Sequence, residues 1–350
     1  MEAQQVMIAM SGGVDSSVAA HLLQKEGYTC QGSIMLLSDG TKDSVADAQS
    51  VARRLGMPFH VFDFSEEFHR QVIRCFIACY EQGDTPNPCI FCNRNLKFSR
   101  FAKEAQALGC QYIATGHYAR IRKDEASGRY LLCKAADLSK DQSYVLYSLS
   151  QEQLSRTLFP LGSLTKQQAR QIAEENGFVN AHKRDSQDIC FIPDGDYVAF
   201  MKSYTGKDYP AGDFLDLNGK VVGKHTGAVG YTLGQRKGLG LAMGAPVYVC
   251  AKDMEKNTVT VGPESALFAT TLLATDWNWI SVPQISEPMR VTAKARYRHT
   301  EQPATVYPEE NGYVKVVFDT PQRALTTGQA VVLYQEDVVV GGGTIRQVCE

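Results

Sequence analysis

Two cysteines lie three residues apart in the segment DTPNPCIFCN, which runs from Asp84 to Asn93. Cys89 and Cys92 have the CxxC spacing found in metal sites and in reactive thiol pairs. A thiolate is both a metal ligand and a nucleophile, so the spacing alone leaves a metal clip, chemistry and a structural role open. A further cysteine, Cys190, follows in the segment DSQDICFI.

A second segment that could do chemistry is AMSGGVDSS, from Ala9 to Ser17. It follows the apolar run Val6–Met10 and precedes an amphipathic stretch that ends near Gly27. Its glycines let the backbone turn tightly and approach a ligand closely. Its amides and the start of the following helix form an anion site. The pattern is neither G-x-x-x-x-G-K-[ST] nor G-x-G-x-x-G, but it predicts a phosphate-binding loop.

Composition is that of an ordinary soluble protein, with 44% hydrophobic residues, 21% charged residues and a net charge of −2. No apolar run approaches the ~20 residues that span a bilayer, and the N-terminus has no basic region of a signal peptide. We therefore expect a cytoplasmic protein without membrane association. Its ten cysteines should be reduced and mostly buried, including Cys75 and Cys79, one helical turn apart.

Strand and helix patterns alternate in the first half of the chain. Strands are predicted at 6–10, 28–37, 59–64 and 111–116, and helices at 43–56, 66–82 and 94–109 as well as after the glycine loop. This alternation predicts an α/β fold with a parallel sheet, whose binding crevice lies beyond the carboxyl ends of the strands. A helical part follows, with Thr165 as an N-cap and Gly177 as a stop.

The second half of the chain is rich in glycine and in short strand patterns. Asn218-Gly219 lies between two alternating runs and predicts a hairpin. The C-terminal strands, such as QAVVLYQ, predict a small antiparallel barrel or sandwich. We expect three domains, with boundaries near Gly195 and Ala274: an α/β domain at 1–195 with a helical extension at about 150–193, a central β-rich domain at 196–273 and a C-terminal β-barrel at 274–350.

The loop SGGVDSS resembles the pyrophosphate loop of the N-type ATP pyrophosphatases, which split ATP into AMP and pyrophosphate. Seven further segments resemble the tRNA-specific 2-thiouridylases, in the same order and over nearly the whole chain: TPNPCIFCN, ATGHYAR, KDQSYVLYSL, DSQDICFI, GYTLGQRKGLG, ARYRHTEQPA and the closing GQAVVLY…GGGTI. The resemblance implies that the α/β domain is an N-type ATP pyrophosphatase (adenine nucleotide alpha hydrolase-like) domain and that the barrel binds tRNA.

The resemblance also implies the reaction. The wobble uridine of tRNA would be adenylylated on its C2 oxygen, and sulfur from a cysteine persulfide would then give 2-thiouridine, AMP and pyrophosphate. Cys190 would carry the persulfide and Cys92 would be the nucleophile, with a transient disulfide between them. ATP, Mg²⁺, tRNA and a cysteine desulfurase or sulfur-relay protein are the implied cofactors and partners. Arg94 or Lys97 should lower the pKa of these thiols.

Two residue sets are carried over from the family. The nucleotide set is Ala9, Met10, Ser11, Gly12, Gly13, Val14, Asp15 and Ser16, with Met35 and Gly116 at the adenosine. The tRNA set is Asn87, Pro88, Cys89, His117, Lys140, Asp141, Gln142, Arg296, Tyr297 and Gln329.

Three alternatives stay open from the sequence. Cys89 stands where many family members have aspartate, so Cys89, Cys92 and Cys190 could instead hold a [4Fe–4S] cluster that delivers sulfur. The chain could also be another N-type ATP pyrophosphatase that acts on a small metabolite. A third alternative is a non-catalytic RNA-binding module that keeps the loop as a relic.

Overall fold

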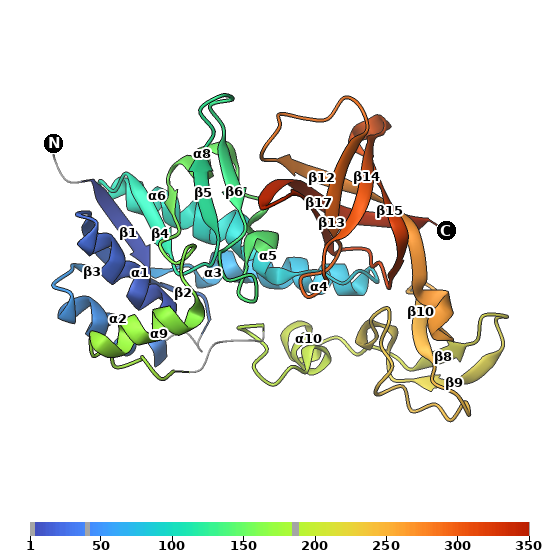
Figure 1. Ribbon diagram of the computed structural model, residues 1–350. Coiled ribbons are helices and arrows are strands. Elements are labelled where there is room, and N and C mark those ends of the chain that lie inside the picture. Colours follow the sequence, from blue (N-terminus) through green and yellow to red (C-terminus); the bar gives the residue numbers. More distant parts are fainter. Residues whose placement is uncertain (1–3, 39–42, 184–188, 350) are drawn as a thin grey trace.

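The computed structural model describes residues 4–38, 43–183 and 189–349 (Figure 1). The first domain is built on a five-stranded sheet in which every neighbouring pair is parallel. This confirms the predicted α/β fold. The strands, in their order across the sheet, are β3 (Phe59–Asp63), β2 (Thr29–Leu36), β1 (Gln5–Ala9), β4 (Tyr112–Thr115) and β7 (Thr157–Leu158).

Both faces of this sheet are covered by helices, which is why β1 reads as an uninterrupted apolar run. Val6 and Ile8 belong to one buried core, whereas Met7 belongs to the core on the opposite face. The first core is covered by α1 (Val14–Lys25), α2 (Asp43–Arg54) and α9 (Lys166–Glu175). The second is covered by α3 (Ser65–Phe68), η2 (His69–Ile73), α4 (Arg74–Glu81), α5 (Pro88–Cys92), η3 (Asn93–Arg100) and α6 (Phe101–Ala107).

The helix that carries the CxxC pair begins at Pro88, not at the predicted Arg94. The Asn87 side chain caps it by accepting a hydrogen bond from the Cys89 amide at 3.1 Å, and proline suits the first helical position. The chain then continues through the π-helical segment η3 into α6 without leaving helical geometry. Both Cys89 and Cys92 therefore lie on a helix.

The prediction that Cys75 and Cys79 are buried was wrong for Cys75. Cys75 is exposed and Cys79 is half-buried, because α4 turns Phe76, Ile77 and Tyr80 toward the core instead. All ten cysteines lie among the described residues and carry free thiols.

The second half of the chain forms two β structures. The hairpin predicted at Asn218-Gly219 is confirmed as β8 (Gly212–Leu215) and β9 (Val221–His225), with Gly219 at φ 80°. It joins β10 (Tyr248–Asp253) and β11 (Thr258–Gly262) in a four-stranded sheet. The barrel closes through pairing of its first and last strands, in the order β12 (Phe268–Trp279), β15 (Val314–Arg323), β14 (Gln302–Pro308), β13 (Met289–Lys294), β16 (Ala330–Gln335) and β17 (Val338–Cys349).

Two features of the β structures differ from the expected boundaries. Ala274 lies within β12, which belongs wholly to the barrel, so we propose that the barrel domain begins at Phe268. A hairpin of the first domain also extends the barrel sheet, because Cys133 pairs with Val338 of β17. This hairpin consists of β5 (Arg120–Lys123) and β6 (Tyr130–Cys133).

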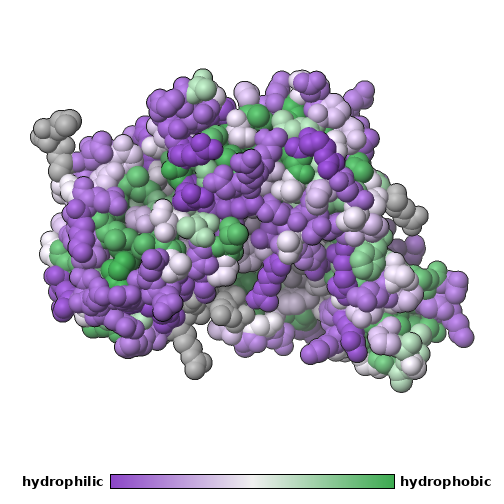
Figure 2. Space-filling model, viewed as in Figure 1, coloured by the Kyte–Doolittle hydropathy of each residue, from purple (hydrophilic) through white to green (hydrophobic). Residues whose placement is uncertain are grey.

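Short helices connect these units. They are α7 (Ser143–Leu146), α8 (Gln151–Ser155), α10 (Tyr197–Thr205), η4 (Ala228–Gly230), η5 (Glu264–Leu267) and η6 (Glu310–Gly312). The α/β domain lies to the left in Figure 1, the barrel at the upper right and the four-stranded sheet at the lower right. In the face shown in Figure 2, apolar residues form small groups among hydrophilic ones. Within the described residues, no helix is both long and apolar enough to span a membrane.

Candidate active site

The glycine loop connects the carboxyl end of β1 to the first turn of α1, as predicted. Gly12 has a φ of +69°, and a Cβ there would lie 2.6 Å from the Ser44 carbonyl oxygen, so only glycine fits. The Ser16 hydroxyl accepts a hydrogen bond from the Ser11 amide at 3.1 Å and donates to the Gly13 carbonyl at 3.2 Å. The loop thus holds its turn by its own hydrogen bonds, with the N-terminal amides of α1 behind it.

A carboxylate and a lysine meet beside this loop. Both Asp15 carboxylate oxygens accept hydrogen bonds from Lys166 Nζ at 2.8 Å, and the Tyr118 hydroxyl donates to Oδ1 at 2.8 Å. The side chains are 31% and 11% exposed for Asp15 and Lys166, so the pair is partly shielded from water. Sequence reasoning missed Lys166 and Tyr118, since each lies far from the loop along the chain.

Residues that follow α9 in the sequence form hydrogen bonds to the glycine loop at Gly12 and to Ser17. The buried Asn180 side chain donates to the Gly12 carbonyl at 3.1 Å and to the Ser17 hydroxyl at 2.9 Å. Lys183 Nζ lies 3.4 Å from the same Gly12 carbonyl and 2.9 Å from Asp47. The sequence offered no spacing signal for these contacts. They place a cationic side chain beside the predicted phosphate loop.

Gly116 and Met35 lie at the carboxyl ends of strands next to β1. A Cβ on Gly116 would lie 2.8 Å from the Ser16 amide nitrogen, so glycine allows β4 to approach the loop closely. Met35 is half-buried against the core that contains Met7, and Met10 is buried in the core on the other face of the sheet. Their role at an adenosine stays a prediction, as do the individual contacts of Ala9, Ser11, Gly13 and Val14.

Mg²⁺ is the metal that the resemblance implies for this loop. Among the described residues, no group of three His, Cys, Asp or Glu side chains is placed to hold a metal ion. Mg²⁺ in nucleotide sites needs only one or two carboxylates, because the phosphates and water supply the other ligands. Asp15 is the carboxylate that the loop offers, so the residues fit a metal that arrives with ATP.

Three cysteines that are distant in the sequence form one neighbourhood. Cys92 is buried at 6% exposure, whereas Cys89 and Cys190 are exposed. Charge on Cys89 or Cys190 raises the pKa of Cys92, and charge on Cys89 raises that of Cys190. The structure therefore places Cys92 and Cys190 in one neighbourhood, with one thiol buried and the other exposed, and their catalytic roles stay predictions.

The expectation that these thiols have lowered pKa values was wrong. Burial raises the pKa of Cys92 to about 12, and the Lys97 ammonium opposes this shift only in part. The packed residues around Cys190 also raise its pKa, although its side chain reaches the surface. Desolvation therefore outweighs the cation in this ligand-free state.

The three thiols do not fit a [4Fe–4S] cluster in this arrangement. They are not placed as a group that could hold a metal ion among the described residues. Cys92 is buried in the core cluster that contains Ile90 and Leu96, while Cys89 points to the surface on the same helix. We therefore derive no step through a cluster.

Lys97 is the cation shared by this neighbourhood, and Arg94 is not. Lys97 lowers the pKa of both Cys92 and Cys190, whereas Arg94 acts on Tyr147. We expect Lys97→Met to raise the pKa of Cys190, so that iodoacetamide labels this thiol several-fold more slowly at pH 8 (about one pKa unit is tenfold in thiolate). Labelling followed by mass spectrometry over a pH series measures the shift.

Arg94→Met is the matched control for this prediction. It removes a neighbouring charge from the same helix and should leave the labelling profile of Cys190 unchanged. Equal slowing in both variants, or none in either, would contradict the assignment of Lys97.

His117 lies next to this neighbourhood as a neutral group. Its Nδ1 is 2.7 Å from the Thr115 hydroxyl, and its ring packs against Phe98 and Phe159. Burial and the Lys97 charge hold its pKa well below the usual value. A contact from His117 to RNA would therefore be a hydrogen bond or a stacking contact and not an ion pair.

The predicted tRNA residues at 140–142 have visible structural partners. The Asp141 carboxylate caps the Ala135 and Ser143 amides at 2.9 and 3.2 Å, and Gln142 accepts from the Tyr118 amide at 2.9 Å. The exposed Tyr297 donates to the Asp141 carbonyl at 3.4 Å. Lys140 N donates to the Asp137 carbonyl. The structure thus brings Lys140, Asp141 and Gln142 next to Tyr297, whereas RNA contact by them stays a prediction.

Arg296 connects the barrel to the central domain. Its Nη2 donates to the Leu233 carbonyl at 3.1 Å and to the Thr326 hydroxyl, and its Nε is buried without a partner among the described residues. These partners are neutral, so the positive charge of Arg296 is not balanced by a carboxylate there. Such a charge remains able to attract a phosphate.

We expect Arg296→Ala to weaken tRNA binding and to lower the dependence of log Kd on log salt by about one unit. Arg290→Ala is the control, because Arg290 is on the same barrel but forms a two-pronged ion pair with Asp319 at 2.8 Å for each bond. Filter binding over a salt series tests both. An unchanged salt slope in Arg296→Ala would mean that this arginine is only a link between domains.

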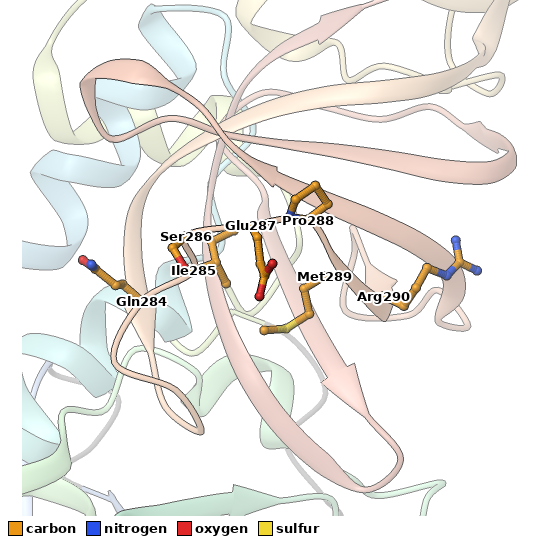
Figure 3. A pocket seen from close by; sticks show the side chains of 7 residues that line it. All are labelled: Gln284, Ile285, Ser286, Glu287, Pro288, Met289 and Arg290. Atoms are coloured by element: carbon orange, nitrogen blue, oxygen red, sulfur yellow. The ribbon is translucent and has the colours of Figure 1, made fainter.

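Two open hollows of the surface are lined by residues of the barrel region. One, of about 410 Å³, is lined by the consecutive residues Gln284, Ile285, Ser286, Glu287, Pro288, Met289 and Arg290 (Figure 3). None of these residues belongs to the glycine loop or to the neighbourhood of Cys92 and Cys190.

Three family models match the chain in succession. They are described as a tRNA methyl transferase HUP domain at residues 4–194, a tRNA methyl transferase PRC-barrel domain at 198–263 and an aminomethyltransferase beta-barrel domain at 269–345. A solved 4-thiouridine synthetase–RNA complex with bound ATP is 16% identical, with a TM-score of 0.38 over 58% of this chain and 50% of that chain. A likeness of that degree supports no conclusion about this chain.

Curated relatives match over the full length. The "tRNA-specific 2-thiouridylase MnmA" of Acetivibrio thermocellus is 48% identical over 99% of this chain and 100% of its own. Those of Clostridioides difficile and Moorella thermoacetica are 47% and 48% identical over 98% of this chain, and over 98% and 100% of their own. The descriptions of the family models mention methyl transfer, whereas the curated relatives are named for thiolation. The relatives carry more weight for the choice of family, because their identity of nearly one half extends over all three domains. The chain belongs to the tRNA-specific 2-thiouridylase family.

Proposed function

We propose that this chain is an ATP-dependent tRNA-uridine 2-sulfurtransferase that thiolates C2 of the wobble uridine. The single observation that carries the proposal is the shared neighbourhood of Cys92, Cys190 and Lys97 in a domain that also holds the SGGVDSS loop. The full-length likeness to relatives named 2-thiouridylases supports the same substrate. Another pyrophosphatase acting on a metabolite would need neither thiol.

The first step activates a poor leaving group. The uridine C2 oxygen attacks the α-phosphorus of ATP, an O–P bond forms, and the bond to pyrophosphate breaks. The loop amides and the start of α1 would stabilise charge on the phosphates. The uridine must leave the anticodon stack to reach them, which costs a few kcal/mol.

The second step moves sulfur. The terminal sulfur of a Cys190 persulfide attacks C2, and AMP leaves with the former C2 oxygen. The Cys92 thiolate then attacks Cys190 Sγ, which releases 2-thiouridine and leaves a Cys92–Cys190 disulfide. An alternative order has Cys92 release hydrosulfide first, with the same disulfide as product. An external dithiol must supply two electrons to reset the pair, and Cys92 must lose a proton that it holds at neutral pH in the ligand-free chain.

The accessibility of the two thiols supports this division of roles. An exposed Cys190 can accept sulfur from a cysteine desulfurase or a sulfur-relay protein, whereas a buried Cys92 is protected from such partners. A tRNA substrate and a thiol cycle that needs reduction favour a cytoplasmic location.

Reconstitution tests the proposal. Purified chain, ATP, Mg²⁺, a persulfide donor and an unmodified tRNA transcript should yield 2-thiouridine, AMP and pyrophosphate in equal amounts, as measured by nucleoside analysis and pyrophosphate release. A transcript with cytidine at the wobble position is the control and should give none. Pyrophosphate release that does not depend on tRNA would favour a metabolite substrate.

Cys89 tests the route of the sulfur. Under the persulfide mechanism Cys89→Asp should retain activity within about twofold, because Cys89 is exposed and aspartate is the residue that many family members have at this position. Anaerobic purification of the wild type and of Cys89→Asp, followed by iron and sulfide analysis, tests for the alternative iron–sulfur route. Iron in the wild type, with loss of both iron and activity in Cys89→Asp, would contradict the persulfide route.

A further inference from the structure

The segment 82–87 joins α4 to the cysteine helix. Thr85 is followed by Pro86 and then by Asn87, whose side chain caps the helix that presents Cys89 and Cys92. Any displacement of Thr85 is therefore transmitted to the first turn of that helix within two residues. α4 and α5 both lie beside the barrel in Figure 1.

A turn of the barrel, residues 326–329, takes both backbone polar groups of Thr85. The Thr85 amide donates to the Thr327 carbonyl at 3.0 Å, and the Gln329 side-chain amide donates to the Thr85 carbonyl at 2.5 Å. These two bonds connect positions more than two hundred residues apart along the chain. They hold Thr85, at the entry of the cysteine helix, to the barrel through both its amide and its carbonyl.

The fit of this barrel turn is close. Gly328 has a φ of +81°, and a Cβ there would lie 2.7 Å from Asp84 Cβ and 2.9 Å from the Thr85 amide nitrogen. The turn is itself fixed to β17, because the Gly328 amide donates to the Ile345 carbonyl and the Ile345 amide donates to the Gln329 carbonyl, each at 2.9 Å. A rigid barrel strand thus supports the contact.

We propose that the barrel turn positions the cysteine helix, and that Gln329 is a positioning residue that acts through Thr85 on Cys92. This role is distinct from the tRNA contact that the family resemblance implied, since one amide N–H of Gln329 donates to Thr85 while its other polar atoms remain available. The part of this proposal that concerns catalysis rests on the proposed function. The barrel, which is far from the adenylating loop in sequence, would then contribute to sulfur transfer by holding the nucleophile in place.

Gln329→Met tests the proposal, since methionine keeps the length of the side chain and removes its donor. Gln322→Met is the matched control, because the Gln322 amide donates to Thr320 within its own strand end and not to the α/β domain. Gly328→Ala is a second disruptive variant that acts by the Cβ clash. Melting temperature and circular dichroism establish that each variant is folded.

The first readout needs neither ATP nor tRNA. Hydrogen exchange of the Thr85 amide should be about tenfold faster in Gln329→Met than in the wild type or Gln322→Met. The second readout is single-turnover thiolation, which should slow by about tenfold to a hundredfold, with pyrophosphate release and tRNA Kd unchanged within about twofold. Gly328→Ala should show the same pattern.

Other outcomes overturn the proposal in distinguishable ways. A higher tRNA Kd with normal single-turnover thiolation at saturating tRNA would make Gln329 an RNA contact. Unchanged hydrogen exchange of the Thr85 amide and unchanged thiolation in a folded Gln329→Met would show that Gln329 does not position the cysteine helix. A wild-type chain that fails to thiolate tRNA would defeat the proposed function, whereas the exchange experiment would still report on the contact between Thr85 and the barrel turn.

Discussion

Cys92→Ser and Cys190→Ser should each abolish 2-thiouridine formation, while pyrophosphate release continues in both. A serine hydroxyl cannot carry persulfide sulfur and is not ionised near neutral pH, so either variant stops the thiol cycle. We expect a loss of more than about a thousandfold for each. The double variant should be no slower than either single one, because residues that act as a unit are not additive.

The two variants should stop at different points, which separates their roles. A persulfide donor should still add one sulfur atom to Cys190 in Cys92→Ser, whereas Cys190→Ser should gain none at this site. Intact-protein and peptide mass spectrometry measures the added sulfur. Persulfide on Cys92 in the Cys190→Ser protein would reverse the assignment.

Fold controls matter most for the buried thiol. Cys92 is within the core, and a buried hydroxyl without a partner costs about 1–3 kcal/mol, so Cys92→Ala provides a second inactive variant with no polar group. Cys75→Ser is the matched surface control, since Cys75 is exposed on α4, outside the neighbourhood of Cys92 and Cys190. Wild-type activity in a folded Cys92→Ala would refute the role of this thiol.

Local patterns predicted the parts of the fold that depend on nearby residues. Thr165 and Gln168 form the two reciprocal hydrogen bonds of a capping box at the start of α9, and Gly177 ends that helical region with a φ of 60°. The Gly12–Gly13 turn between an apolar strand and a helix predicted the loop, and the positive φ of Gly12 favours glycine. These signals are local, although Gly12 also packs closely against the distant Ser44.

The features that the sequence did not predict depend on contacts between distant segments. The pKa of Cys92 is set by the core around it, and no spacing rule reports burial of that kind. The pairing of Cys133 with Val338 joins two domains through one hairpin, and the start of the cysteine helix was missed because the two prolines looked like a loop. Only the folded chain shows that Lys166 reaches Asp15.

Asp15→Ala should remove adenylylation, with a fall in pyrophosphate release of at least about a hundredfold, because the loop loses its carboxylate beside the phosphates. The tRNA Kd should stay nearly unchanged, since the proposed RNA contacts lie elsewhere. Asp15→Ala also leaves Lys166 without its two carboxylate bonds. Since both side chains keep some exposure, we expect a loss of about 1–3 kcal/mol in stability, below the range for fully buried pairs.

The double variant Asp15→Ala/Lys166→Met separates catalysis from stability. Removing the ammonium together with the carboxylate should restore part of the melting temperature, because a largely buried charge that has lost its two carboxylate bonds is then absent. Pyrophosphate release should remain as low as in Asp15→Ala if the carboxylate itself interacts with the phosphates or binds the metal that accompanies them. If pyrophosphate release in the double variant recovered together with stability, Asp15 would be only the structural partner of Lys166. If Asp15→Ala alone released pyrophosphate at the wild-type rate, SGGVDSS would not be the adenylating loop.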